Sequence, residues 1–278
     1  MTKTIAVHGA TGSQGAPVAD AFIAAGHVVR PLTRATGADL LDRASLEAAY
    51  AGADAVVLHL PIVYDERVVA MADNAARAVE AAGVRHLVLN TGGPAPGEKT
   101  GVPFLDARVH AAAADVPLVT VLLPTAYMEN LSAPWSAERL VRDGVVAYPL
   151  PAEAPMPWVA TADVAAAAVR AVEDAVTGWF ALPGVPVTGH EVAAQLGAVL
   201  DRELRWEPIA PREFGERLRP FLGDHAAEGT ATVYEMLAAA PRGPAPDPAA
   251  AREALGWAPR SVAEWASEVS WPLARTAA

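Results

Sequence analysis

The first half of the chain alternates short apolar runs with alanine-rich amphipathic stretches. The runs TIAVH, AVVLHL and LVTVLL are typical of strands buried on both faces of a sheet. The pattern predicts strands over 4–8, 28–32, 55–60, 86–90 and 118–123, and helices over 16–25, 45–51, 65–82 and 104–114. Ser45 is the expected N-cap of the second helix. Strands that alternate with helices predict right-handed crossovers and a doubly wound parallel α/β sheet.

The rhythm changes after about Pro124. Loops become rich in proline, most of the tryptophans lie beyond residue 150, and a helix is predicted over 161–175. The remainder, 180–278, is typical of helices with a little strand, interrupted by a stiff PRGPAPDP linker at 241–248. We expect a larger domain over 1–150 and a small C-terminal lobe over 151–278 that is interleaved with it.

Composition excludes several classes of protein. The 278 residues include no cysteine, so disulfides, thiolate metal sites and cysteine nucleophiles are excluded. A formal net charge of −11 argues against nucleic-acid and anionic-membrane partners. No apolar run approaches the roughly 18 residues that span a bilayer, and the chain enters its first strand after Met-Thr-Lys, so we expect no signal peptide and a cytoplasmic location. We expect no metal, because neither HExxH nor a dense carboxylate cluster is present.

A glycine motif with GxxGxxG spacing follows the first strand and precedes the first helix. In that place small residues allow a sharp turn and a close backbone approach to a pyrophosphate, and the helix N-terminus offers N–H groups to it. The alternative is a plain glycine turn. The residues expected to bind a dinucleotide here are Gly9, Thr11, Gly12, Ser13, Gln14 and Gly15.

The second strand ends at the position that contacts the adenosine ribose. NAD enzymes usually carry an acidic residue there, about 20 residues past the glycines. Here the chain reads RPLTR and ends on Arg34. A guanidinium binds phosphate oxygens in a bidentate manner, which favours NADP(H) over NAD; the alternative is a solvated loop charge. Asp39 and Leu40 either hold the adenine edge or belong to an ordinary loop.

Longer segments resemble the atypical short-chain dehydrogenase/reductase superfamily, in particular its NmrA-like branch. The matching segments are GATGSQG (9–15), VVRPLTR (28–34), ADLLDRASLEAAYAGADAVV (38–57), LVLNTGG (87–93), LLPTAYMENL (122–131), MPWVATADVAAAAV (156–169) and LGWAPRSVAEWASE (255–268). The resemblance implies a Rossmann-like NADP-binding domain, a small substrate-binding lobe, and cofactor contacts from Leu60 and Pro124. The family includes reductases of quinones, ketones and plant phenolics, and also non-catalytic redox sensors. Here the span between Arg34 and Asp39 is unusually short.

The resemblance also implies an acid pair that this chain lacks. Reductases of the superfamily usually use a Tyr and a Lys four residues later. The only lysines are Lys3 and Lys99, and neither follows a tyrosine at that spacing. Phe104 stands at the Tyr position and Arg108 at the Lys position. Phenylalanine cannot donate a proton, and arginine stays charged at any working pH.

Three residues remain as catalytic candidates. Thr91 follows its strand and could hydrogen-bond a carbonyl oxygen, or only the backbone. Arg108 could contact ribose or stabilise negative charge, or be a helix-surface cation. His59 points toward the carboxyl edge of the sheet with a useful pKa, unless it is structural. The candidate substrate-pocket walls, which could equally be core, are Tyr64, Tyr127, Met128 and Asn130.

Two functions follow. The first is an NADPH-dependent reductase of a ketone or quinone on an aromatic substrate, acting as a monomer or homodimer and taking its proton from water or from the substrate. A Trp-bearing second half suits a flat aromatic ligand. By analogy, and because the composition is typical of a GC-rich genome, we narrow this first function further: the chain resembles the ketoreductases of actinobacterial polyketides such as angucyclinones. The second is a non-catalytic NADP sensor that binds other proteins, which the missing acid pair favours.

Overall fold

The apolar runs of the first half form one parallel sheet. In the computed structural model, which describes residues 1–91, 103–239 and 246–271, six strands lie in the order β2-β1-β3-β4-β5-β9 and neighbouring strands are parallel. The strands are β1 (Thr4–His8), β2 (Val28–Leu32), β3 (Ala55–His59), β4 (His86–Asn90), β5 (Leu118–Pro124) and β9 (Gly178–Leu182). This order confirms the predicted doubly wound α/β sheet.

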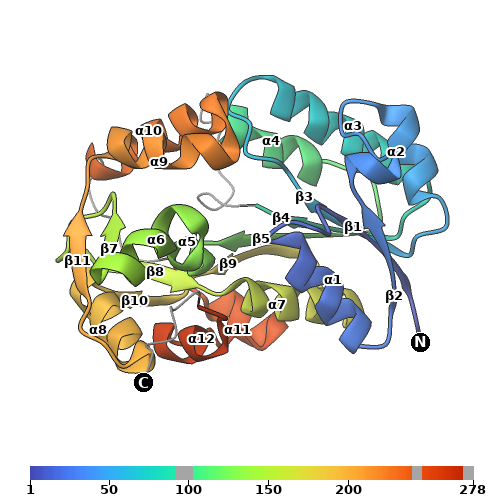
Figure 1. The fold of residues 1–278 in the computed structure, drawn as a ribbon. Coiled ribbons are helices and arrows are strands. Elements are labelled where there is room, and N and C mark those ends of the chain that lie inside the picture. The colour runs from blue at the N-terminus through green and yellow to red at the C-terminus, as the bar shows by residue number, and fades with distance from the viewer. Residues whose placement is uncertain (92–102, 240–245, 272–278) are drawn as a thin grey trace. The chain divides into compact units, whose positions relative to one another are not determined.

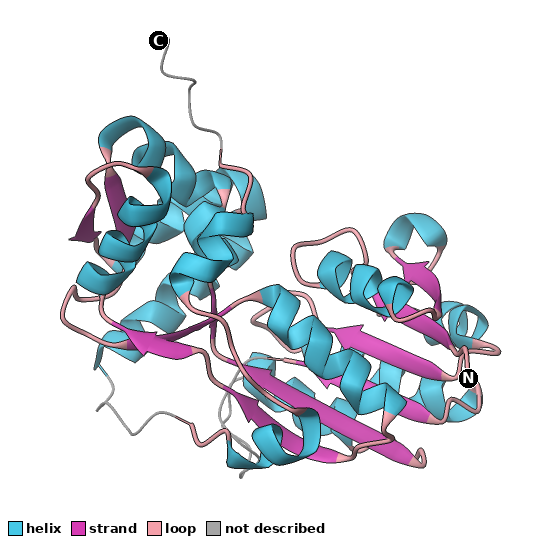
Figure 2. Ribbon diagram, turned by 90° about the horizontal axis from the view of Figure 1, so that it is seen from below, coloured by secondary structure: helices cyan, strands magenta, loops and turns pink. Residues whose placement is uncertain are grey.

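Helices cover both faces of this sheet (Figure 1), which is why its strands are apolar throughout. In Figure 2 the strands run side by side between these helices. One face carries α1 (Gly15–Ala24), α7 (Thr161–Glu173) and α11 (Ala249–Leu255). The other carries α2 (Arg43–Tyr50), α3 (Arg67–Ala81) and α4 (Pro103–Ala112). No helix among the described residues is long and apolar enough to cross a membrane.

The chain divides into two compact units, each made of three segments. Unit 1 contains the six-stranded sheet and comprises Met1–Thr125, Thr161–Leu182 and Pro246–Ala258. Unit 2 comprises Ala126–Ala160, Pro183–Ala245 and Pro259–Ala278. The boundary at residue 150 that the sequence suggested falls inside the first segment of unit 2. The first five residues of the proline-rich stretch, 241–245, lie outside the described residues.

Unit 2 has two small sheets and six helices among its described residues. Its strands are β6 (Ala126–Tyr127), β8 (Met156–Val159) and β10 (Val185–Val187) in one sheet, and β7 (Val145–Tyr148) and β11 (Arg205–Pro208) in the other. Its helices are α5 (Glu129–Ser132), α6 (Pro134–Asp143), α8 (Gly189–Leu200), α9 (Pro211–Leu222), α10 (Asp224–Ala239) and α12 (Val262–Glu268).

The aromatic residues of unit 2 build its core. Tyr148 is fully buried and packs against Trp158, Trp206 and Phe214 with ring centroids 5.1–5.8 Å apart. The Tyr148 and Tyr234 hydroxyls lie 2.5 Å apart. The expectation that tryptophans of the second half present a surface to a flat ligand is therefore wrong for Trp158 and Trp206, which are 1% and 7% exposed. Their apolar area stabilises the fold instead.

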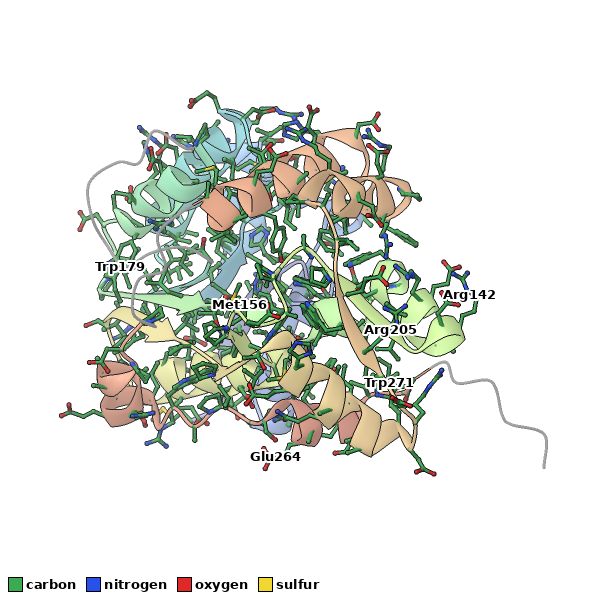
Figure 3. The ribbon with its side chains drawn as sticks, turned by 90° about the vertical axis from the view of Figure 1, so that its left-hand side faces the viewer. Arg142, Met156, Trp179, Arg205, Glu264 and Trp271 are labelled. Carbon is green, nitrogen blue, oxygen red and sulfur yellow. The ribbon has the colours of Figure 1, made fainter. Side chains whose placement is uncertain are left out.

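Arginine–carboxylate pairs lie on the outside of unit 2. Arg142 pairs with Glu138, and Arg205 pairs with Glu207 at 2.8 Å. Figure 3 shows Arg142 and Glu264 pointing away from the ribbon. Exposed pairs of this kind contribute at most about 1 kcal/mol each. Their main effect is to make the surface of unit 2 polar, and they add little to its stability.

The predicted helices and strands are present. Their ends differ from the predicted residues where a local hydrogen bond sets the boundary. The second helix begins at Arg43 and not at Ser45, because the Asp42 carboxylate caps it by accepting from the backbone N–H groups of Ala44 and Ser45. The Ser45 hydroxyl donates to the Asp42 carbonyl at 2.8 Å. The expectation that Ser45 is the N-cap is therefore wrong, since Asp42, three residues earlier, caps a helix that begins nearly one turn sooner.

Three histidines are buried in the six-stranded sheet and are held neutral. Burial, aided by the nearby His59, lowers the pKa of His8 to about 3, and burial lowers that of His59 to about 4. Burial and the charge of Lys3 lower the pKa of His86 to about 4. The Thr120 hydroxyl donates to the Val176 carbonyl, so His86 Nε2–H donates to Thr120 Oγ1 at 2.7 Å.

These histidines predict that the protein loses stability in mild acid. An unfolded histidine has a pKa of about 6.5, so between about pH 4 and 6.5 the unfolded chain binds more protons, and the free energy of unfolding rises with pH. Above 6.5 their contribution is constant. Replacing His86 by Gln should reduce this slope by up to about 1.4 kcal/mol per pH unit in urea titrations. An equal slope in the His86 variant would contradict the assignment.

Candidate cofactor-binding site

The strand order creates a crevice between β1 and β3. The chain leaves β1 toward β2 on one side and leaves β3 toward β4 on the other, so the loops after these two strands diverge at the carboxyl edge of the sheet. Ligands of open α/β sheets bind at such a switch point. The loop after β1 is the glycine motif, and the loop after β3 is the segment 60–66.

The glycine loop is shaped by two close backbone contacts. Gly9 has φ +63°, and its N–H donates to the Leu32 carbonyl at 3.0 Å. The Gly12 N–H donates to the Gly9 carbonyl at 2.8 Å. A β-carbon on Gly15 would lie 2.2 Å from the Gly9 carbonyl oxygen, so only glycine allows α1 to begin this close to the loop.

This loop and the start of α1 suit an anion. Thr11, Gly12 and Ser13 are exposed, and Gln14 precedes the helix without capping it through its side chain. The first turn of α1 contains no acidic residue. Within that turn the Ala16 N–H donates to the Gly12 carbonyl at 3.0 Å, and Pro17 has no N–H. A phosphate would therefore meet the positive end of the helix dipole and the N–H groups of residues 13–15. The structure thus brings the six predicted residues, 9 and 11–15, together in one loop at the start of α1, which we call the glycine cradle, and their binding of a dinucleotide pyrophosphate remains a prediction.

The short segment after β2 folds as a single turn. Arg34–Thr36 forms a 3₁₀ helix (η1) capped by the Thr33 hydroxyl, and Gly37 ends it with φ +83°. Arg34 is exposed, and its side chain has no hydrogen-bond or ionic partner among the described residues. This turn makes up the short span between Arg34 and Asp39 and leaves the guanidinium accessible.

Asp39 and Leu40 follow this turn. The Asp39 carboxylate accepts from the Leu41 N–H at 2.9 Å, and the Leu40 carbonyl accepts from the Asn74 amide at 3.1 Å. These bonds fix the backbone of the loop. An adenine contact by either residue remains a prediction, as do the cofactor contacts of Leu60, which is partly buried, and of Pro124, which ends β5.

His59 stands at the carboxyl end of β3, opposite Asn90 of β4. The Asn90 amide nitrogen lies 3.1 Å from His59 Nδ1. When that amide donates, the imidazole proton is on Nε2, a buried atom without a hydrogen-bond partner among the described residues. With a pKa of about 4, lowered by burial, the ring is neutral at physiological pH. The expectation of a pKa useful for acid catalysis is therefore wrong, and His59 is a neutral N–H donor.

Arg108 is buried in the second turn of α4. The residue is 2% exposed, so the alternative of a helix-surface cation is wrong. Its Nε and Nη1 atoms have no hydrogen-bond partner among the described residues. Burial lowers its pKa, while the charge of Asp106 opposes that shift. A buried guanidinium with unused donors is costly unless an anionic or strongly polar ligand completes it.

Thr91 and Tyr64 lie on the same unit as Arg108. Thr91 directly follows β4, is 7% exposed, and donates its N–H to the Leu122 carbonyl at 3.1 Å. Tyr64 lies in the loop after β3 and packs its ring on Phe104, with centroids 5.4 Å apart. The catalytic roles of Thr91 and Arg108 stay predictions.

The other predicted substrate residues belong to unit 2. Tyr127 lies in β6 and is half-buried. Met128 is fully buried in the unit 2 core, as the alternative interpretation had it. The Asn130 side chain hydrogen-bonds the Tyr148 hydroxyl.

Sequence reasoning missed two residues of the carboxyl edge. His8 ends β1, and its Nε2 lies 2.6 Å from the Tyr50 hydroxyl. Asn90 ends β4 and orients His59. Both are the last residue of a strand in the same sheet as His59, and applying the strand-end rule to every strand would have found them.

Several solved structures share this fold at low sequence identity. A nucleoside-diphosphate-sugar epimerase from Staphylococcus aureus has a TM-score of 0.74 at 20% identity, over 96% of this chain and 100% of that one. An NADPH-dependent quinone oxidoreductase from Escherichia coli has 0.67 at 22%, over 95% and 98%. The negative transcriptional regulator NmrA, in complex with NADP, has 0.69 at 20%, over 98% and 96%.

Sequence comparison identifies the family. No curated protein matches the chain. The profile of the NmrA-like family matches residues 1–266, which include the glycine loop, the six-stranded sheet and almost all of the described part of unit 2. Taken with the crevice and its glycine cradle, this match shows that the chain belongs to the NmrA-like family.

Proposed function

We propose that this protein is an NADPH-dependent reductase of a carbonyl group on an aromatic acceptor. The observation that carries the proposal is Arg108, a buried guanidinium with two donor atoms that no described residue satisfies. In a sensor such a group would contact only the cofactor, for example its ribose. A reductase needs one, because negative charge develops on the acceptor oxygen.

Each candidate site residue of unit 1 has a separate role in this proposal. The glycine cradle holds the pyrophosphate, and Arg34 binds the 2′-phosphate that distinguishes NADPH from NADH. A bound nicotinamide supplies the hydride. Arg108 stabilises the charge on the acceptor oxygen, while His59 Nε2–H and the Thr91 hydroxyl are neutral donors at the same sheet edge. Because these groups stabilise charge without donating a formal proton, acceptors that delocalise the charge suit them best.

This chemistry favours quinones and ketones that carry a neighbouring phenol. Reduction of a quinone by hydride leaves a phenolate. In a ketone beside a phenol, the new alkoxide oxygen takes the phenol's proton, which again leaves a phenolate, far less basic than a simple alkoxide. An aromatic polyketide of the angucyclinone type is one substrate with that arrangement, and we propose it as the narrower candidate. The relatives described as a quinone oxidoreductase and a triphenylmethane reductase support a reductase of aromatic compounds.

A second function, an NADP-sensing regulator, is favoured by two observations. The chain has no Tyr-x-x-x-Lys pair, and Trp158 and Trp206 are core residues and not the walls of a ligand pocket. NmrA itself is described as a negative transcriptional regulator. The two functions share the cofactor cradle and differ in whether bound NADPH is oxidised.

Arg34 predicts the cofactor preference. Arg34→Gln removes the cation that contacts the 2′-phosphate, so the Kd for NADPH should rise at least about tenfold while that for NADH changes less than about twofold. Calorimetric titration of both cofactors measures this difference. Arg43→Gln is the matched control, because Arg43 is a nearby exposed arginine already paired with Glu47 at 2.7 Å. Equal loss for both cofactors would contradict an NADP-specific role.

Turnover separates the reductase from the sensor. NADPH oxidation, followed at 340 nm against quinones, phenolic polycyclic ketones and simple ketones, should be fast with the first two classes and slow with the third. The physical reason is that only the first two leave a delocalised anion. Tight NADPH binding without turnover on any acceptor would contradict the reductase and favour the sensor.

A further inference from the structure

The last residues of β3 and β4 carry side chains that contact each other. His59 and Asn90 are direct partners in the register of these two parallel strands. Register partners on neighbouring strands point to the same face of a sheet, and the Asn90 amide nitrogen lies 3.1 Å from His59 Nδ1. Asn90 is 3% exposed. The contact is therefore built into the pairing of two central strands and does not depend on a loop.

This contact decides which ring nitrogen of His59 holds the proton. An amide nitrogen donates and cannot accept, so His59 Nδ1 must be the acceptor. Burial lowers the pKa of His59 to about 4, and the neutral ring that results carries a single N–H group, which is then on Nε2. If the Asn90 amide were turned over, its oxygen would face the ring and the proton would move to Nδ1. Asn90 therefore selects the tautomer of His59.

The N–H group selected in this way lacks an acceptor. His59 Nε2 is buried and has no hydrogen-bond partner among the described residues. The other two neutral histidines of the sheet are engaged at this atom. His8 Nε2 lies 2.6 Å from the Tyr50 hydroxyl. His86 Nε2 lies 2.7 Å from Thr120 Oγ1. A buried N–H without an acceptor costs free energy, which a ligand atom with a lone pair would offset.

The residue that carries this N–H group ends a strand at the switch point of the sheet. His59 is the last residue of β3, which flanks that point together with β1. The His59 side chain is only partly buried as a whole, so a ligand can reach it. A dinucleotide offers phosphate, ribose and carboxamide oxygens, all of which have lone pairs. A ring with its proton on Nδ1 would instead turn a lone pair toward these oxygens and repel them.

From these contacts we infer that Asn90 is a positioning residue, which holds His59 as an Nε2–H donor to an oxygen atom of the bound dinucleotide. The inference rests on the proposed function for the identity of that ligand. Asn90 acts through the imidazole and need not touch the ligand itself. His59 donates a hydrogen bond and releases no proton, so it contributes affinity and orientation and not acid catalysis.

The tautomer of His59 is measured directly in protein labelled with ¹⁵N in the histidine rings. Long-range ¹H–¹⁵N spectra at neutral pH distinguish protonated from unprotonated ring nitrogens, and the His59 signals are identified by their loss in His59→Gln. The wild type should show a protonated Nε2 and an unprotonated Nδ1. In Asn90→Asp the ionised carboxylate only accepts, so Nδ1 should carry a proton. Asn74→Asp is the matched control and should keep the wild-type pattern, because the Asn74 amide contacts the Leu40 carbonyl.

The contact with the ligand is tested with NADPH. Saturating NADPH should shift the His59 Nε2–H signal and slow its exchange with solvent at least about tenfold. His59→Phe, which keeps a ring but removes the donor, should raise the Kd for NADPH about tenfold in calorimetric titrations. Asn90→Leu should raise this Kd about threefold in the wild type and not at all in His59→Phe, because Asn90 acts only through His59. A merely structural role of Asn90 would weaken binding equally in both backgrounds.

The outcomes separate the inference from the proposed function. A protonated Nδ1 in the wild type would overturn the inference and leave the reductase standing, since the reductase is judged by turnover. An Nε2–H signal that saturating NADPH leaves unmoved would also overturn the inference. A shifted signal in a protein that reduces none of the acceptors would support the inference and overturn the reductase. A protein that does not bind NADPH would overturn both.

Discussion

The approach of α1 to the end of β1 is the constraint on which the cofactor cradle depends. The Gly9 carbonyl oxygen lies 2.2 Å from where a β-carbon of residue 15 would stand, so any other residue would push the helix away. That closeness places the N-terminal end of α1 at the topological switch point between β1 and β3. The same carbonyl accepts from Gly12, which makes the loop rigid before any phosphate arrives. The cradle is therefore preorganised by backbone packing.

Charge is distributed around this cradle in an unusual way. Burial keeps His8 and His59, at the carboxyl edge of the sheet, neutral. Among the groups assigned to the site, Arg108 is the one buried cation. A site of this kind lowers the energy of an anion more readily than it supplies a proton. The reductase proposed above, which has no Tyr-x-x-x-Lys pair, would depend on such stabilisation of negative charge.

Periodicity predicts this fold well because the sheet is buried on both faces. Runs such as AVVLHL leave little choice but a central strand, and their alternation with helices predicts parallel pairing. The strand order and the sixth strand, β9, were not predicted. Helix ends are less predictable, because the capping side chain can come from a residue several positions away from the expected one. Asp42, and not Ser45, caps the second helix. The pKa of His59 was not predictable at all, since it depends on burial that only the packed sheet creates. The contact of Tyr64 with Phe104 joins residues 40 positions apart and has no local signal.

Hydrogen exchange of the glycine-loop amides tests the central claim most directly. The claim is that the glycine loop and the start of α1, residues 9–16, bind the pyrophosphate of NADPH. Saturating NADPH should slow exchange in this segment at least about tenfold, and residues 34–40 should also be protected by NADPH but much less by NADH. Unchanged exchange over residues 9–16 at a concentration of NADPH that saturates the protein would contradict the account.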